Sequence, residues 1–186
     1  MGFSKFIKAT KIEKSIKSIK SIEIIDNLFE KLNLNEKIEE EKVFTFTITN
    51  FNFDGLSYKS CIEIYKDGRP FSYFIEPWLV LKFPFLKHIK GCKPHDHVNV
   101  DNEDITYDQK TFTKLGCKFM PSNMIGQGRT FNEEVFNEKA SKLIYIIVSN
   151  VYFPQIKVKF IKGIDLIKTY QNGIIKFKDH DNFFKV

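Results

Sequence analysis

The sequence predicts a mixed α/β fold in which helices flank one β-sheet, and three features indicate it. The run VFTFTITNFNF at 43–53 alternates apolar residues with Thr or Asn, which is typical of a strand with one buried face. The run LIYIIVS at 143–149 is continuously apolar, as a fully buried central strand is. Segments with helical spacing of apolar residues, such as 132–142, alternate with such strands, which is the element order of an α/β domain.

The first forty residues predict a helix, from Ser4 to Glu40, because isoleucines and leucines recur at helical spacing. Its repeat SIKSIKSIE, at 15–23, has one apolar and one basic face. A solvated amphipathic helix explains this pattern, and a helix that contacts DNA or forms a dimer is the alternative.

Two strands, 43–53 and 59–65, are expected to form a hairpin through the turn Asp54-Gly55. A helix over 74–89 follows, begun by Glu76-Pro77 and distorted by Pro84.

A second hairpin is expected from strands 97–100 and 104–111, joined by the polar turn 101–103. The later elements follow the same logic: a loop at 115–130, the helix 132–142, the buried strand 143–149, a strand at 157–161, a short helix from 163–167 and an edge strand or tail at 173–178.

The chain length of 186 residues suits one domain, with a helical N-terminal segment at 1–42 and a core at 43–186. The net charge of +6 favours a polyanionic partner such as nucleic acid. A composition rich in Lys, Ile, Asn and Phe, as an AT-rich genome produces, explains the same excess, so charge alone does not decide.

Cys61, Cys92 and Cys117 are odd in number, without CxxC spacing and without a preceding signal peptide. They predict reduced thiols in a cytoplasmic protein. No apolar run is long enough to span a bilayer, so no membrane partner is expected.

Three charged residues of the second hairpin form the candidate site. Asp108 and Lys110 share one face of their strand because alternate strand residues do, and pairing through the 101–103 turn brings Asp96 beside Asp108. Two close carboxylates repel unless a cation lies between them, and oxygen ligands suit Mg²⁺. The backbone carbonyl of Gln109 is a further candidate ligand. Such a site holds a phosphodiester, polarises it and activates water, while Lys110 orients the nucleophile and stabilises charge.

Asp96 followed by Asp108-x-Lys110 on the next strand resembles the PD-(D/E)xK signature of type II restriction endonucleases. The order of hairpin, loop, helix and buried strand resembles that family over about half of the chain, although His95 separates Pro94 from Asp96. The resemblance implies a restriction-endonuclease-like fold and Mg²⁺-dependent, sequence-specific cleavage of double-stranded DNA. It also implies a restriction-modification system with a companion DNA methyltransferase, a two-fold homodimer, and a further acid from an upstream helix, for which Glu76 is the matching residue.

The loop from Thr113 to Arg129 follows the candidate site and carries side chains that DNA-binding proteins use. Amides pair with adenine, Arg with guanine, and Lys with phosphates. A solvated surface loop is the alternative. The candidate DNA-binding residues are Lys114, Lys118, Asn123, Gln127 and Arg129.

Other readings remain beside this one. Asp108 and Lys110 could form a surface ion pair, with Asp96 as a turn residue. His95 and His97 suggest a zinc or iron site, but alternation turns both away from Asp96. The site also suits a structure-selective or repair nuclease, and the charge suits a non-catalytic DNA-binding protein. Nucleotide-binding and serine-hydrolase signatures are absent from the sequence.

Overall fold

The computed structural model describes residues 42–49, 53–91 and 94–185. The chain divides into two units at Glu39 and Glu40, close to the predicted boundary at residue 42, and every described element belongs to the second. The helix predicted over 4–40 lies outside the described residues.

A six-stranded mixed sheet, in the order β1-β7-β6-β4-β3-β2, forms the centre of the described unit. Neighbouring strands are antiparallel except β4 and β6, which run parallel. A second sheet has two strands, β5 and β8. The strands are β1 (Val43–Thr47), β2 (Leu86–His88), β3 (His97–Asn99), β4 (Thr106–Phe112), β5 (Cys117–Lys118), β6 (Ile144–Ser149), β7 (Gln155–Lys162) and β8 (Ile174–Ile175).

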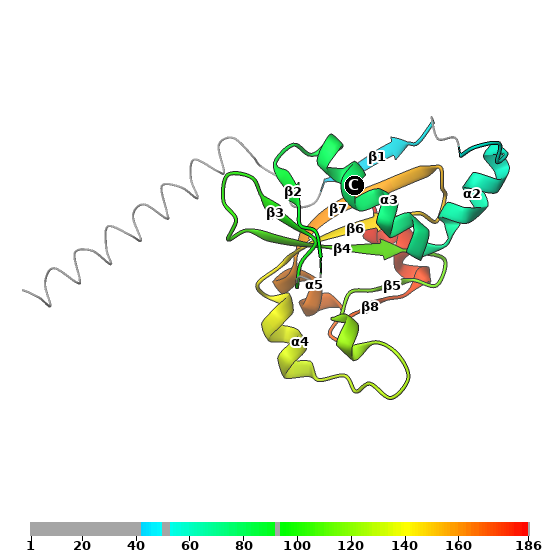
Figure 1. Ribbon diagram of the computed structural model, residues 1–186. Helices are drawn as coiled ribbons and strands as arrows, with labels where there is room; N and C mark the ends of the chain where they lie inside the picture. The colour runs from blue at the N-terminus through cyan, green and yellow to red at the C-terminus, as the bar shows by residue number, and fades with distance from the viewer. Residues whose placement is uncertain (1–41, 50–52, 92–93, 186) are drawn as a thin grey trace, which may run out of the picture. The chain divides into compact units, whose positions relative to one another are not determined.

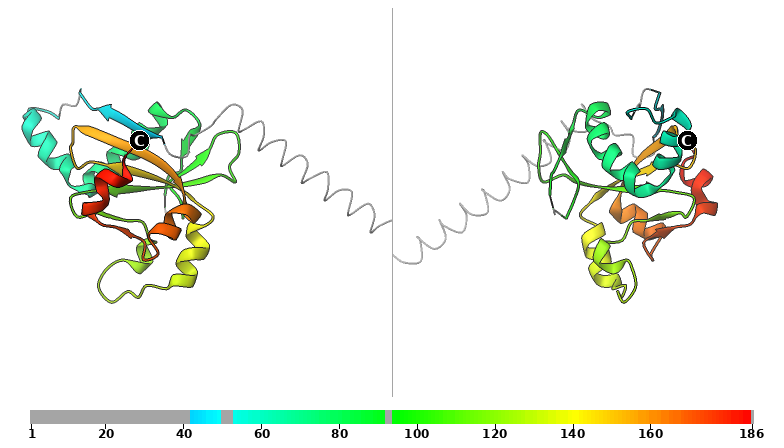
Figure 2. Two further views of the ribbon diagram at one scale, coloured as in Figure 1. Left: turned by 180° about the vertical axis from the view of Figure 1, so that it is seen from behind. Right: turned by 45° about the vertical axis from the view of Figure 1, so that its right-hand side comes forward.

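Helices cover both faces of the large sheet, so the predicted mixed α/β class with flanking helices is confirmed (Figure 1). Helix α3 packs on β2 and β4 on one face, while α5 packs on β7 and α4 (Figure 2). The α-helices are α2 (Tyr58–Lys66), α3 (Gly68–Lys82), α4 (Glu133–Ala140), α5 (Gly163–Thr169) and α6 (His180–Phe183).

The first predicted hairpin is wrong, because its second strand, 59–65, lies within helix α2. Ser57 caps this helix by accepting a hydrogen bond from the Ser60 N–H, and the buried Cys61 and Tyr65 are one helical turn apart. Strand β1 pairs with β7 instead, antiparallel, with Val43 opposite Lys159.

The helix predicted over 74–89 begins and ends earlier than expected. Asp67 caps α3 by accepting from the Arg69 N–H, and Pro77 lies inside the helix rather than at its start. The helix ends at Lys82 because Phe83 precedes Pro84, and a residue before proline disfavours helical geometry. Residues 86–88 then form strand β2.

The second predicted hairpin is confirmed. Strands β3 and β4 pair antiparallel, with His97 opposite Tyr107 and Val98 opposite Thr106. The apolar run after α4 forms the buried central strand β6, as expected. The tail predicted at 173–178 contributes β8, which pairs with β5 rather than with the large sheet.

Alternate side chains of strand β4 pack into two different regions, one on each face of the large sheet. On one face the Tyr107 ring contacts those of Phe85 and Phe160, at centroid distances of 6.1 and 6.3 Å. On the other, the Phe112 ring lies 5.0 Å from the His180 ring and 5.9 Å from the Phe184 ring. Asp108 and Lys110 therefore share the second face, with Phe112.

None of the helices in the described part of the chain is long and apolar enough to cross a membrane. The thiols of Cys61 and Cys117 are free and buried.

Candidate active site

Asp96 is held against β4 by its main chain and its side chain. Its N–H donates to the Tyr107 carbonyl at 3.0 Å, which extends the antiparallel pairing by one residue beyond β3. Its carboxylate Oδ2 then accepts from the Gln109 N–H at 2.7 Å. The Asp96 carboxylate thus accepts the β4 hydrogen bond that a backbone carbonyl would accept if β3 continued to pair with β4.

The carbonyl of Gln109 points toward the same side of β4. In a strand, the N–H and C=O of one residue face the same neighbouring strand, and the Gln109 N–H faces Asp96. The Gln109 side chain is buried on the opposite face, where its Nε2 donates to Thr111 Oγ1 at 3.2 Å. Only the backbone of Gln109 therefore belongs to the candidate site.

Asp108 and Lys110 form an ion pair of 2.8 Å on the face that they share. The side chains of the two residues are only 13% and 23% exposed, respectively. The ion pair of the alternative interpretation is therefore present, but it is mostly buried rather than exposed on the surface. A desolvated pair contributes little net stability without further hydrogen bonds, so stability alone does not account for it.

Burial and the neighbouring Asp96 carboxyl raise the pKa of Asp108 to about 7, although Lys110 opposes the shift. The Asp96 carboxyl is thus close enough to act on Asp108, and the raised pKa favours the protonated form of Asp108. Burial alone would lower the pKa of Lys110, but Asp108 and Asp96 outweigh it and raise that pKa.

Glu76 joins the group from helix α3. Burial and then the charge of Asp96 raise the pKa of Glu76, while His88 and Lys110 oppose the shift. Its Oε2 lies 3.3 Å from His88 Nε2. The structure therefore brings the four predicted side chains, Glu76, Asp96, Asp108 and Lys110, into one electrostatically linked cluster.

Two histidines that line this cluster connect α3 to the sheet. His97 is fully buried, and its Nε2 donates to the Glu76 carbonyl at 3.0 Å, so its Nδ1 carries no proton and has no hydrogen-bond partner in the structure. Burial lowers the pKa of His97. Its ring packs against that of His88, with centroids 5.3 Å apart. His97 thus faces α3 and not the carboxylates, as the alternation predicts.

His88 is the residue that sequence reasoning missed. Its segment was predicted as the end of a helix, so nothing placed it opposite His97 on a neighbouring strand. An isolated histidine in an apolar stretch carries no other sequence signal.

The donor set fits a hard divalent cation on chemical grounds. Asp96 and Asp108 supply carboxylate oxygens, and a cation between them would relieve the repulsion that, together with burial, raises the pKa of Asp108. Among residues 42–49, 53–91 and 94–185, no group of three or more His, Cys, Asp and Glu side chains could hold a metal ion. The ligands that would bind Mg²⁺ here are thus two carboxylates and a backbone carbonyl, with water in the other positions, which is a ligand set that Mg²⁺ accepts.

The predicted DNA-binding residues are spread over a long segment. Lys114 follows β4 and lines a hollow of about 470 Å³ beside Lys66 and Arg69, at the end of β4 away from Asp108. Lys118 lies on β5, exposed. Asn123 lies in a short 3-10 helix, and Gln127 is exposed in the loop after it.

Arg129 is engaged within its own loop. Its guanidinium donates to the backbone carbonyls of Ser122 and Ile125, the latter at 3.0 Å. These contacts close the segment 122–129, so the loop has internal structure rather than being merely solvated.

A second constellation resembles a hydrolase triad but cannot act as one. Ser149 Oγ lies 2.8 Å from His180 Nε2, and His180 Nδ1 lies 2.8 Å from Asp181 Oδ1. Ser149 and His180 are each only 2% exposed, so a substrate carbonyl has no access to the hydroxyl. These bonds attach α6 to the end of β6.

No protein-family model matches the chain, and neither the curated proteins nor the solved structures that were compared with it give a match.

Proposed function

We propose that the protein is a Mg²⁺-dependent DNA endonuclease of the PD-(D/E)xK kind, with Asp96, Asp108 and Lys110 as its active site. The observation that carries the proposal is the largely buried ion pair of Asp108 and Lys110 beside a second carboxylate, Asp96, which is held on the next residue of the same strand, Gln109. Neighbouring like charges cost stability, and they are common where a site is arranged for chemistry.

The arrangement of the elements supports the same proposal. Helix α3 precedes the antiparallel strands β2, β3 and β4, and α4 follows before β6 runs parallel to β4. This order agrees with the restriction-endonuclease-like order expected from the sequence, with the upstream helix supplying Glu76.

Asp96, Asp108 and the Gln109 carbonyl are the groups that would hold Mg²⁺. When bound, Mg²⁺ would supply positive charge that polarises a phosphoryl oxygen and favours deprotonation of the attacking water.

Each side chain has a distinct role in the proposed hydrolysis. Lys110 remains protonated at neutral pH, because the carboxyls raise its pKa, and its ammonium stabilises the charge that develops on the phosphate. It also orients the attacking water. Glu76 supplies an additional carboxylate at the edge of the site, held by His88.

Sequence-specific double-stranded cleavage, as in a restriction-modification system, requires two sites. We therefore propose a two-fold homodimer on double-stranded DNA, with a companion methyltransferase in the same system. Candidate contacts to DNA outside the catalytic cluster are Lys114, Lys118, Asn123 and Gln127, while Arg129 orders the loop that carries the last two.

The test is digestion of a long DNA by the purified chain with and without Mg²⁺. Discrete fragments that require Mg²⁺, and that disappear with Asp108→Ala, are the expected result. A smear without preferred sites would favour a structure-selective or repair nuclease. Binding without any cleavage by the wild type would favour the non-catalytic alternative.

A further inference from the structure

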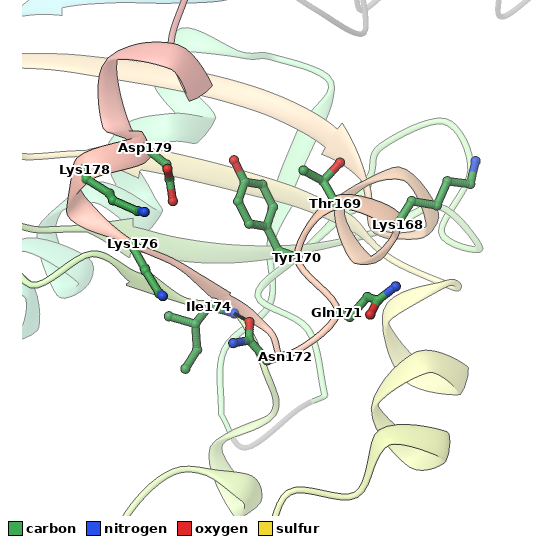
Figure 3. A pocket seen from close by; sticks show the side chains of 9 residues that line it. All are labelled: Lys168, Thr169, Tyr170, Gln171, Asn172, Ile174, Lys176, Lys178 and Asp179. Atoms are coloured by element: carbon green, nitrogen blue, oxygen red, sulfur yellow. Dashed lines mark hydrogen bonds between the residues drawn. The ribbon is translucent and has the colours of Figure 1, made fainter.

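A basic hollow lies between α5, β8 and residues 176–179, which the candidate active site does not use (Figure 3). Its volume is about 610 Å³, and it is open to solvent. The residues that matter are Lys168, Tyr170, Gln171, Asn172, Lys176 and Lys178.

The lysines of this hollow differ in whether they form an ion pair with a carboxylate. Lys168 pairs with Asp165 at 2.7 Å. Within the described part of the chain, no carboxylate forms an ion pair with Lys176 or Lys178, and both side chains are exposed. Among the residues that the structure describes, Asp179 is the only acidic one that lines the hollow. Lys176 and Lys178 therefore carry charge that is available to a partner.

The pairing of β5 with β8 adds Lys118 to this surface. Lys118 lies opposite Ile174, and paired residues of an antiparallel ladder share a face. Lys176 follows Ile174 by two residues in extended conformation, so it continues on that face. Lys118, Lys176 and Lys178 thus form one cationic surface, which we call the β5–β8 surface.

The β5–β8 surface belongs to the layer that covers the active-site face of the large sheet. Cys117, next to Lys118, is buried in the same apolar cluster as Phe112 of β4, and β5 contacts β4. Burial raises the pKa of Cys117 to about 12, and the charges of Lys110 and Asp108 also act on it. The inward side of this layer thus lies near the catalytic pair, and its outward side carries the lysines.

We propose that the β5–β8 surface binds the phosphate backbone of duplex DNA away from the phosphodiester that is cut. This rests on the proposed function, which makes DNA the substrate. Ammonium groups bind phosphates as point charges, and the amides of Gln171 and Asn172 and the Tyr170 hydroxyl donate hydrogen bonds to phosphate oxygens. The aliphatic lining is limited to the half-buried Ile174, and Phe177, which is 44% exposed, is the one large apolar side chain between Lys176 and Lys178. One ring among lysines is less apolar surface than a membrane-inserting surface needs.

The experiment measures binding of a labelled duplex of about 30 base pairs by fluorescence anisotropy, in EDTA, over a series of salt concentrations. The variant is Lys176→Gln with Lys178→Gln. The matched control is Lys59→Gln with Lys82→Gln, which removes the same charge from the helices α2 and α3. Vesicles containing phosphatidylserine serve as a competing anionic surface.

Each phosphate contact contributes about 0.9 to the slope of log affinity against log salt. We expect the Lys176/Lys178 variant to bind about tenfold more weakly and to lose about two units of slope, with the control within about twofold of wild type. Equal losses in both variants, no loss in either, or vesicles displacing the duplex would overturn the proposal.

The outcome is separable from that of the nuclease proposal. A wild type that cuts DNA while the Lys176/Lys178 variant binds normally would leave the nuclease standing and remove this surface. A wild type that binds DNA through these lysines and never cuts it would support the β5–β8 surface and contradict the nuclease proposal.

Discussion

Asp108 is the residue on which the chemistry depends most, and its environment sets a pH dependence. Burial and the Asp96 carboxyl raise its pKa from 3.8 to about 7, so folding favours the protonated form. This contribution to stability is complete below pH 3.8 and is lost as the pH rises through about 7. Metal binding requires the ionised form of Asp108, so the stabilisation that a bound metal ion supplies increases as the pH rises.

We predict that Mg²⁺ stabilises the protein more at pH 8 than at pH 5, because at pH 5 protons compete for Asp108. Mg²⁺ at tenfold its Kd contributes about 1.4 kcal/mol, or a shift of roughly 3 °C in Tm. Thermal unfolding at both pH values measures it, with Asp108→Asn as the control that should lose the response. An equal response in the Asn variant would mean that Mg²⁺ binds elsewhere.

The contact between His88 and Glu76 gives a second prediction at this scale. His88 lowers the pKa of Glu76, against the effects of burial and Asp96, so His88→Ala should raise that pKa further. Carboxyl NMR of the metal-free protein measures this. Cleavage should slow by about tenfold or more, as when groups that orient a metal site are lost, with His88→Gln partly restoring it.

The matched control is Lys87→Gln, which alters the exposed neighbour of His88 on β2 that pairs with Glu103. It should leave both the pKa of Glu76 and the cleavage rate unchanged. If His88→Ala moves neither quantity, His88 does not position Glu76.

The carboxylates and the lysine could be predicted from the sequence, whereas the histidine could not. The two-residue spacing of Asp108 and Lys110 fixes their common face in any strand, and a short polar turn fixes the register of Asp96. His88 required knowledge of which strand lies beside β3, and that depends on long-range pairing.

The type and the ends of some helices and strands were hard to predict, because neighbouring residues favour different structures. The segment 58–66 alternates enough to suggest a strand, but the Ser57 cap and the spacing of Cys61 and Tyr65 favour the helix. Pro84 was read as distorting a helix, whereas it ends one and lets β2 form. The apolar run of β6 contains no competing signal, because this strand is buried on both faces of the sheet.

The junction of β7 and α5 yields a prediction at the scale of elements. Gly163 lies so close to the end of α4 that an added Cβ would be 1.8 Å from the Ala140 carbonyl oxygen. Gly163→Ala should therefore destabilise the fold by roughly 2 kcal/mol or more, since backbone must move. Denaturant unfolding measures it.

Gly91→Ala is an informative comparison, because Gly91 has φ of +92° but no neighbour within 4 Å of an added Cβ. Its cost should reflect backbone strain alone, about 1 kcal/mol. Equal costs at the two positions would contradict the account of the Gly163 contact.

At the scale of the whole molecule, the sheet order could not be deduced from periodicity. Strand β1 was expected beside the segment that follows it, yet it pairs with β7, more than a hundred residues later. Only tertiary packing decides such pairings, which is why the α/β class was predictable and the topology was not.

Two-site cleavage predicts a molecular mass twice that of the 21.9 kDa chain. Sedimentation equilibrium with and without duplex DNA measures it. A monomer that remains monomeric on DNA would argue against a restriction enzyme cutting both strands, while still permitting a nuclease that nicks one.

In the proposed function, Asp96, Asp108 and Lys110 together hydrolyse a phosphodiester. Conversion of supercoiled plasmid to nicked and linear forms measures this hydrolysis, with the wild type and with Asp108→Asn, each in Mg²⁺ and in EDTA. We predict conversion by the wild type with Mg²⁺ alone, and a loss of at least about a hundredfold in the variant. Conversion by Asp108→Asn at the wild-type rate, or plasmid left intact by the wild type, would show that these residues do not form a nuclease site.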